Sequence, residues 1–276
     1  MGSKTAEAIT VAATYNAAAD HFDDKPLSFW DRYGRLTVER LRLPNGAVVL
    51  DVGCGAGASA LPAAQSVGDS GRVIGVDLAE SLLARARAKA NALSLTNVEL
   101  LCADMTALDF PEASFDAVIS VFSIFFVPDM VALTGSLWRM LRSGGRLAIT
   151  TWGPRAWEPG SSIWWAAVQR VRPDLVPSIN PWERVIDPQA VSKLMFDAGI
   201  EFTQVVPVAG QQELADPHDW WSIVLGSGYR WTVEQMRPDE REQVRTDCLD
   251  AFKQREIKAI ETNVIFAEAT KAKGAN

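Results

Sequence analysis

The sequence predicts an α/β fold in which helices cover both faces of a doubly wound sheet. Three observations predict it. Short β-branched runs alternate with helical stretches along the chain, a hydrophobic strand leads directly into a glycine-rich loop, and the length suits one large domain. The 276 residues are 48% hydrophobic and 22% charged, which is ordinary for a soluble globular protein.

Seven short hydrophobic runs are expected to form the strands of the sheet. They lie at residues 47–52, 72–77, 97–104, 115–123, 145–152, 202–210 and 263–272. The last of these runs is the seventh strand in sequence order. A chain of 276 residues is long enough to bury a full hydrophobic core.

Helices are expected between the strands because apolar residues recur there at helical spacing. A helix over about 58–67 follows the first strand, and one with Leu82, Leu83 and Ala86 on its inner face follows the second. The helix before 145–152 would be capped by the stretch "RSGG". A helix over 187–199 would begin with Asp187 as its N-cap.

The chain divides into three parts around this sheet. Residues 1–44 are predicted to form an N-terminal helical lid, 45–152 the ligand-binding core, and 153–276 the rest of the same domain. Two insertions, 153–186 and 211–262, are expected to be helical caps, and they hold seven of the ten tryptophans.

The net charge and the cysteine content argue against several classes of function. A net charge of −7 and a pI near 5.0 argue against binding to nucleic acid or to anionic membranes. Three widely spaced cysteines indicate neither a disulfide framework nor a metal site. With no signal peptide and no apolar stretch of membrane-spanning length, we expect a cytoplasmic protein. Its oligomeric state is not indicated.

The stretch "VVLDVGCGAGASA" at 48–60 is the most specific signal in the chain. Gly53, Gly55 and Gly57 follow a strand and lead into a helix, so the loop offers free backbone N–H groups to an anionic ligand. Read as G-x-G-x-x-A it would bind a dinucleotide, and read as D-x-G-x-G-x-G it would bind S-adenosylmethionine. The glycines alone leave both cofactors open.

Acidic residues at the strand ends favour S-adenosylmethionine. Asp51, two residues before Gly53, would repel a pyrophosphate but attract an ammonium group. Asp77 ends the second strand, where an acid can accept both ribose hydroxyls of either cofactor. Asp104 follows the third strand and could accept a hydrogen bond from an adenine amino group. Leu78 and Met105 would flank the adenine ring.

These motifs, in this order, resemble the class I S-adenosylmethionine-dependent methyltransferases, in particular the ubiquinone and menaquinone biosynthesis type. The stretches that carry the resemblance are "VLDVGCGAG", "VIGVDLAESLLARARA", "LLCADMTALDFPEASFDAVISVFSIFFV" and "MLRSGGRLAITTW". It covers roughly 45–152 and is weak elsewhere. It implies a Rossmann-like seven-stranded sheet whose last strand is antiparallel, and it implies that Ser120 lies near the cofactor.

The resemblance also implies N-terminal helices that close over the cofactor, with Trp30 and Tyr33 as candidate lid residues. Phe122 and Phe126, where the fourth strand ends, are candidate acceptor-binding residues, as is Trp152 at the end of the fifth. Cys54 is expected to contribute its backbone only. Packing is the alternative interpretation of each aromatic side chain.

The expected function is methyl transfer to a small-molecule acceptor. The tryptophan-rich insertions favour an apolar or aromatic one. The chain has two histidines, His21 and His218, and neither follows the fourth or fifth strand, so neither is expected to be a general base. The catalytic residues stay unassigned. Two alternatives are an NAD-dependent oxidoreductase and a non-catalytic S-adenosylmethionine-binding protein.

Overall fold

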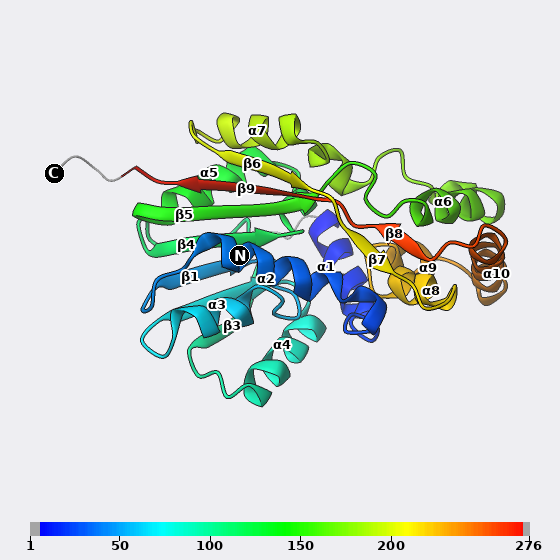
Figure 1. Ribbon diagram of the computed structural model, residues 1–276, viewed down its shortest axis with the longest axis horizontal. Helices are drawn as coiled ribbons and strands as arrows, with labels where there is room; N and C mark the ends of the chain where they lie inside the picture. Colours follow the sequence, from blue (N-terminus) through cyan, green and yellow to red (C-terminus); the bar gives the residue numbers. More distant parts are fainter. Residues whose placement is uncertain (1–5, 273–276) are drawn as a thin grey trace.

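A computed structural model describes residues 6–272 of the chain, the first four of these by their backbone alone. Its main sheet has seven strands in the order β3-β2-β1-β4-β5-β9-β6 (Figure 1). The first five strands are mutually parallel, whereas β9 runs antiparallel to both of its neighbours, β5 and β6. This confirms the predicted seven-stranded Rossmann-like sheet with an antiparallel last strand.

The strands lie close to the predicted positions. They are β1 Val48–Val52, β2 Arg72–Asp77, β3 Val98–Cys102, β4 Phe115–Val121, β5 Leu141–Trp152, β6 Gln204–Val208 and β9 Val264–Thr270. A separate two-stranded sheet pairs β7 Gln211–Glu213 with β8 Ala259–Glu261, and it was not predicted. Each of these strands is only three residues long, which is too short to show an alternating hydrophobic pattern, and the two are far apart in sequence.

The helices fall into two groups. The first is associated with the sheet and consists of α1 Ala6–Ala18, α2 Phe29–Leu41, α3 Ala60–Val67, α4 Glu80–Ala92, α5 Met130–Met140 and α7 Pro188–Asp197. The second consists of α6 Gly160–Val171, α8 His218–Leu225, α9 Arg230–Glu234 and α10 Pro238–Gln254. Four short 3₁₀ segments complete the chain: η1 Lys25–Leu27, η2 Ile124–Phe126, η3 Pro173–Leu175 and η4 Pro181–Val185.

Both faces of the sheet are buried, which explains why its strands read as continuous hydrophobic runs. In β1, Val49 packs into one core cluster with Ala63 of α3, while Leu50 and Val52 pack into a second with Leu133 of α5. Alternate residues of a strand point to opposite faces, so each face receives its own layer of helices. The fold is therefore doubly wound.

The two tryptophan-rich insertions gather beyond one end of the sheet. Figure 1 shows α6, α8, α9 and α10 together there, reached by the extended segments β7 and β8. The first insertion, 153–186, contains α6, and the second, 211–262, contains α8 to α10. Since β5 runs directly into the first insertion, this is the end at which the parallel strands have their carboxyl termini.

Several predicted boundaries were wrong, for local reasons. The stretch "RSGG" belongs to β5, because Leu141 already pairs with Phe115 and an irregularity in register follows. The fourth strand ends at Val121 rather than at 123, because Phe122 turns into the left-handed region with φ 53°. The predicted cap of α7 is confirmed, since the Asp187 carboxylate accepts from the N–H groups of Gln189 and Ala190.

Candidate functional site

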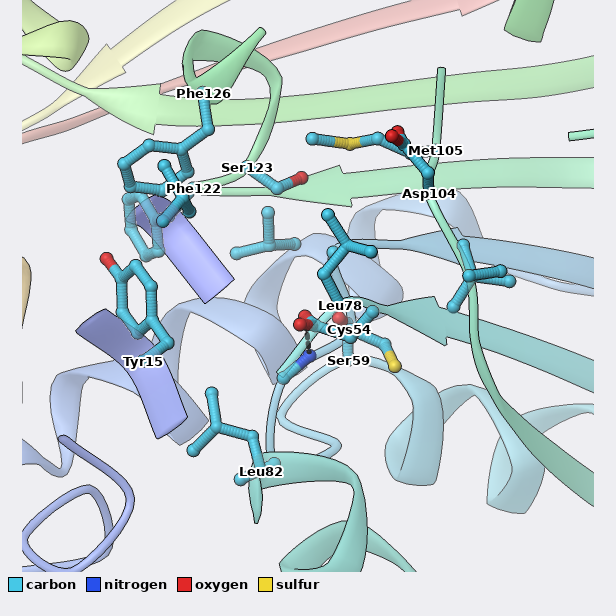
Figure 2. Close-up of a pocket in the computed structure, with 18 of the residues that line it drawn as sticks. Tyr15, Cys54, Ser59, Leu78, Leu82, Asp104, Met105, Phe122, Ser123 and Phe126 are labelled. Atoms are coloured by element: carbon cyan, nitrogen blue, oxygen red, sulfur yellow. Dashed lines mark hydrogen bonds between the residues drawn. The ribbon is translucent and has the colours of Figure 1, made fainter. Parts of the chain in front are cut away.

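A cavity of about 150 Å³ lies at the carboxyl ends of the parallel strands (Figure 2). The strand order reverses between β1 and β4, and ligands of open α/β sheets bind in the crevice at such a reversal. The cavity is lined by the loop after β1, the ends of β2, β3 and β4, and residues of α1 and α2.

The loop after β1 approaches the end of β4 very closely. Gly53 has φ +68°, and a Cβ atom built on it would lie 2.2 Å from the Cβ of Ser123. Only glycine fits this contact. Gly53 and Gly55 line the cavity, whereas Gly57 lies behind it, where its Cα faces the Leu61 side chain of α3. Gly57 therefore shapes the loop from outside the cavity.

Asp51, predicted to bind the cofactor, is fully buried beneath this loop and does not itself line the cavity. Its Oδ2 accepts a hydrogen bond of 2.7 Å from the Ser59 hydroxyl, while its Oδ1 has no partner. Burial raises the pKa of Asp51 to about 7, the Ser59 hydrogen bond opposes this rise, and the charge of Asp77 adds to it. A buried carboxylate with a free oxygen is suited to receive a cation or a hydrogen-bond donor.

Asp77 and Asp104 line the cavity at the ends of β2 and β3. Asp77 accepts 2.8 Å hydrogen bonds from the backbone N–H groups of Gly55 and Ala79, yet burial keeps its pKa above the usual value. Asp104 accepts from the N–H and the hydroxyl of Thr106, at 2.9 and 2.7 Å. Leu78 and Met105, the residues after each acid, also line the cavity.

At the end of β4, the structure places Ser123 on the cavity and Ser120 away from it. Ser120 is fully buried, and its hydroxyl lies 2.7 Å from that of Ser123, which donates to the carbonyl of Val52. Between them, Phe122 holds a left-handed backbone conformation that costs about 1–3 kcal/mol in a non-glycine residue. This backbone conformation directs the Phe122 side chain onto the cavity wall.

Of the five aromatic residues predicted for the lid or the acceptor site, Trp30, Phe122 and Phe126 line this cavity. Tyr33 does not, because its hydroxyl is buried and donates a 2.6 Å hydrogen bond to the carbonyl of Thr262. Trp152 stacks on Phe122 with a ring separation of 4.0 Å and lines only a smaller adjoining cavity. That second cavity is walled mainly by aromatic residues, of which Trp157, Trp182 and Tyr229 come from the two insertions.

Sequence reasoning missed three residues of the N-terminal segment that line the main cavity: Val11, Tyr15 and Phe22. Tyr15 and Phe126 make an edge-to-face ring contact at 5.5 Å. The alanine-rich sequence around Tyr15 contains no motif, so nothing local distinguished it from a packing residue. Ser123 was missed for a similar reason, since its role depends on the approach of the glycine loop.

Neither histidine lines a cavity. The Nδ1 atom of His21 lies 2.8 Å from the Asp24 carboxylate, and that of His218 lies 3.4 Å from the Arg245 guanidinium. Cys54 lines the main cavity, but burial holds the pKa of its thiol well above the usual range, so it is uncharged. Within residues 6–272, no three His, Cys, Asp or Glu side chains are grouped in a way that could hold a metal ion. No helix of that range is long and apolar enough to span a bilayer.

Comparison with known proteins identifies the core. Residues 49–145 match the model of a methyltransferase domain family. The aklanonic acid methyltransferase DauC of Streptomyces sp. (strain C5) is 35% identical over 141 residues, which are 51% of this chain and 64% of that enzyme. The nocamycin O-methyltransferase of Saccharothrix syringae is 30% identical over 254 residues, covering 85% of this chain and 88% of that protein.

Solved structures share the fold. A phosphoethanolamine N-methyltransferase 2 of Haemonchus contortus, solved with S-adenosylhomocysteine, has a TM-score of 0.61 at 16% identity and covers 98% of this chain and 61% of its own. A methyltransferase structure from Bacillus halodurans has a TM-score of 0.57 at 17% identity and covers 86% and 97% of the two chains. At these identities the likeness concerns the fold alone.

The residues of the cavity fit S-adenosylmethionine. The free Oδ1 of Asp51 under the glycine loop suits a ligand that brings an ammonium group rather than a pyrophosphate. Gly53 and Gly55 bring the loop backbone to the cavity, and Asp77 and Asp104 offer acceptors at adjacent strand ends. This chemistry and the match to the nocamycin enzyme decide between the two cofactor interpretations. The chain belongs to the class I S-adenosylmethionine-dependent methyltransferases.

Proposed function

We propose that this protein transfers the methyl group of S-adenosylmethionine to a small, largely apolar or aromatic acceptor. One observation carries the proposal: the cavity at the strand ends and the smaller aromatic cavity share a wall made of Tyr15, Trp30, Phe122 and Phe126. A ligand held by the glycine loop and the acids would thus adjoin a cavity with aromatic walls, which measures about 10 Å³ in this structure and would widen to admit a flat apolar molecule. The names of the aklanonic acid and nocamycin enzymes support a small-molecule acceptor.

Within this proposal, each of the three acids and the two apolar residues beside them has a definite task. Asp51 would receive the ammonium group, Asp77 the ribose hydroxyls, and Asp104 the adenine amino group, with Leu78 and Met105 beside the ring. When bound, S-adenosylmethionine supplies a methyl group activated by its sulfonium. The aromatic wall would hold the acceptor in line with this methyl group and exclude water, which is the main contribution a protein makes to such a transfer.

The lid and the caps would determine which acceptor fits. Helix α1 contributes Val11 and Tyr15 to the main cavity, and the two insertions contribute Trp157, Trp182 and Tyr229 to the smaller one. Both cavities are therefore closed by segments outside 45–152. These segments, and not the core, are proposed to carry substrate specificity.

The experiment is to incubate the protein with methyl-labelled S-adenosylmethionine and an extract of the source cell, then identify the labelled compound. Label is expected in a small molecule that partitions into organic solvent. Label found only on protein, on nucleic acid or in a hydrophilic metabolite would contradict the proposal. An incubation without the protein measures the background.

A variant pair locates the acceptor. Phe126→Ala removes part of the shared wall, so the KM for the identified acceptor should rise about tenfold while the affinity for S-adenosylmethionine changes little. Phe196→Ala, in a side chain that is 69% exposed and distant in sequence from both cavities, is the matched control. Equal KM values for the two variants would place the acceptor elsewhere.

A further inference from the structure

The wall shared by the two cavities contains two polar side-chain atoms. Of its four residues, Phe122 and Phe126 have none, while Tyr15 has its hydroxyl and Trp30 its indole nitrogen Nε1. An acceptor that reaches from the aromatic cavity into the main one would lie along the wall that holds these two groups. Their hydrogen-bonding state therefore bears on what the acceptor is.

The indole N–H of Trp30 is buried and unpartnered. Trp30 is only 8% exposed, and its Nε1 has no hydrogen-bond partner. The ring is fixed by parallel stacking on Phe22 at 5.4 Å and by an edge contact with Phe122 at 5.5 Å. An indole nitrogen can only donate, and a buried donor without an acceptor is unfavourable. Trp30 thus holds a fixed, unpartnered donor within the wall that the two cavities share.

The Tyr15 hydroxyl makes no hydrogen bond to any residue in the described range. It faces the second insertion, where a Cβ atom built on Gly228 would lie 3.7 Å from it. Burial, together with the charge of Asp77, raises the pKa of Tyr15 above its usual value, so the hydroxyl keeps its proton and can donate. Figure 2 shows it on the side of Phe126 and Phe122, across the cavity from Asp104.

A proton acceptor is missing from this wall. Asp77 and Asp104 are the only carboxylates among the described residues that line either cavity, and no histidine, lysine, arginine or glutamate lines them. Asp77 is bound to the N–H groups of Gly55 and Ala79, and Asp104 to Thr106. The place for the acceptor therefore provides donors without a base.

We propose that the Tyr15 hydroxyl and the Trp30 indole N–H donate hydrogen bonds to one oxygen of the acceptor, and that this oxygen is already anionic when it binds. The acceptor class is then a carboxylate, or a phenol or enol acidic enough to ionise in solution. This inference rests on the proposed methyl transfer and specifies its substrate. An alcohol, or an amine that is protonated in solution, would have to lose a proton before it could attack, and the wall has no group to take that proton.

The reaction balances without a base. A lone pair of the acceptor oxygen forms the new O–CH3 bond as the S–CH3 bond breaks, and the bonding electrons stay on sulfur, which becomes a neutral thioether. The anion and the sulfonium cation both lose their charge, giving a neutral ester or ether, and no proton is released. Until then, the two donors offset the unfavourable burial of the anion and orient its lone pair.

Binding tests the inference apart from turnover. The probes are 2-naphthoate and the neutral, nearly isosteric 2-naphthamide, titrated into the protein saturated with S-adenosylhomocysteine. The wild type should bind naphthoate at least tenfold more tightly than naphthamide. Tyr15→Phe and Trp30→Phe should each reduce this ratio about tenfold, because a hydrogen bond to a charged group is stronger than one to a neutral group.

Two substitutions serve as matched controls. Tyr33→Phe removes a buried tyrosine hydroxyl that lines neither cavity, and Trp164→Phe removes a buried, unpartnered indole N–H away from both. Both should keep the wild-type ratio. A similar fall in the ratio for the controls would show that the Tyr15 and Trp30 effects are merely structural and would overturn the assignment.

The possible results separate this inference from the proposed function. Equal binding of the two probes, tighter binding of naphthamide, or binding of neither would overturn the anionic acceptor. So would a labelled product from the extract that carries its new methyl group on an amine, although methyl transfer would then stand. A product identified as an ester or an acidic phenol ether, together with the expected probe ratio, would support both. Failure to find any methylated small molecule would count against the proposed function alone.

Discussion

Gly34 of α2 lies directly against Ala58 of the glycine loop: a Cβ atom built on Gly34 would be 2.3 Å from the Ala58 carbonyl oxygen. Ala58 itself lines the cavity. The helix therefore supports the loop from behind, and a glycine in the middle of a helix is present because no side chain fits. This contact connects the N-terminal segment to the cofactor-binding core.

We expect Gly34→Ala to displace α2 from the loop. The free energy of unfolding should fall by about 1–3 kcal/mol, the usual effect of overpacking, and the affinity for S-adenosylmethionine should fall with it. Gly135→Ala in α5 is the control, since its Cβ would meet only an ordinary contact at 3.5 Å and alanine favours a helix. Denaturant titration and calorimetry measure both quantities. A stable Gly34→Ala protein with normal affinity would contradict this account.

Asp77 is expected to dominate cofactor affinity. Asp77→Ala should weaken binding of S-adenosylmethionine by about 1.5–3 kcal/mol, because hydrogen bonds to a charged group are lost. It also removes the acceptor of the Gly55 and Ala79 N–H groups, so circular dichroism should confirm that the fold is intact. Asp109→Ala, an exposed acid, is the control. If calorimetry found the two variants equally tight, the ribose site would lie elsewhere.

Asp51 makes stability depend on pH. Its pKa rises from 3.8 in the unfolded reference to about 7 in the fold, so the folded state binds the extra proton between these values. Stability is therefore lost as pH rises from about 4 to 7, and the penalty stays constant above that. Asp51→Asn removes this pH-dependent penalty. Without ligand, the free energy of unfolding of this variant, relative to that of the wild type, should therefore increase by on the order of 2 kcal/mol between pH 5 and pH 8.

Urea titrations of the ligand-free proteins at pH 5 and pH 8 measure this change, with Asp109→Asn as the exposed control. The same Asp51→Asn substitution should weaken S-adenosylmethionine binding, since the carboxylate proposed to receive the ammonium group is gone. A pH-independent difference between Asp51→Asn and the wild type would mean that Asp51 ionises normally in the fold.

The change in melting temperature on adding each cofactor shows which one the protein binds. S-adenosylmethionine and S-adenosylhomocysteine should raise Tm in a concentration-dependent way, because a ligand bound only by the native state stabilises it by mass action. NAD should leave Tm unchanged at the same concentrations. Stabilisation by NAD alone is the outcome that would refute the assigned cofactor.

The two histidines are expected to be dispensable. His21 is bound to Asp24 and His218 lies next to Arg245, and neither lines a cavity. With the identified acceptor, His21→Ala and His218→Ala should each retain most of kcat. An imidazole base would also produce a rate that rises through a pKa near 6.5, and none is expected. A hundredfold loss of kcat with normal cofactor affinity would identify that histidine as the base.

The sequence by itself determined the core of this protein. The glycine loop, Asp77 and Asp104 could be placed in advance because each follows directly on a strand, and parallel strands bring their carboxyl ends to one edge of the sheet. The hydrophobic runs gave the seven strands, the family resemblance implied that the last is antiparallel, and the structure supplied their order in the sheet. Local sequence is sufficient for these residues because the location of each one is set by the strand that directly precedes it.

Only the tertiary structure decided the aromatic wall. Trp30 and Tyr33 lie three residues apart on one helix. The Tyr33 hydroxyl nevertheless donates to the carbonyl of Thr262, whereas the Trp30 ring lines the cavity. Tyr15, with no motif around it, is placed there by the packing of α1. Whether an aromatic residue lines a pocket or packs in the core depends on segments far away in sequence. Helical spacing does not indicate which of these segments will pack against it.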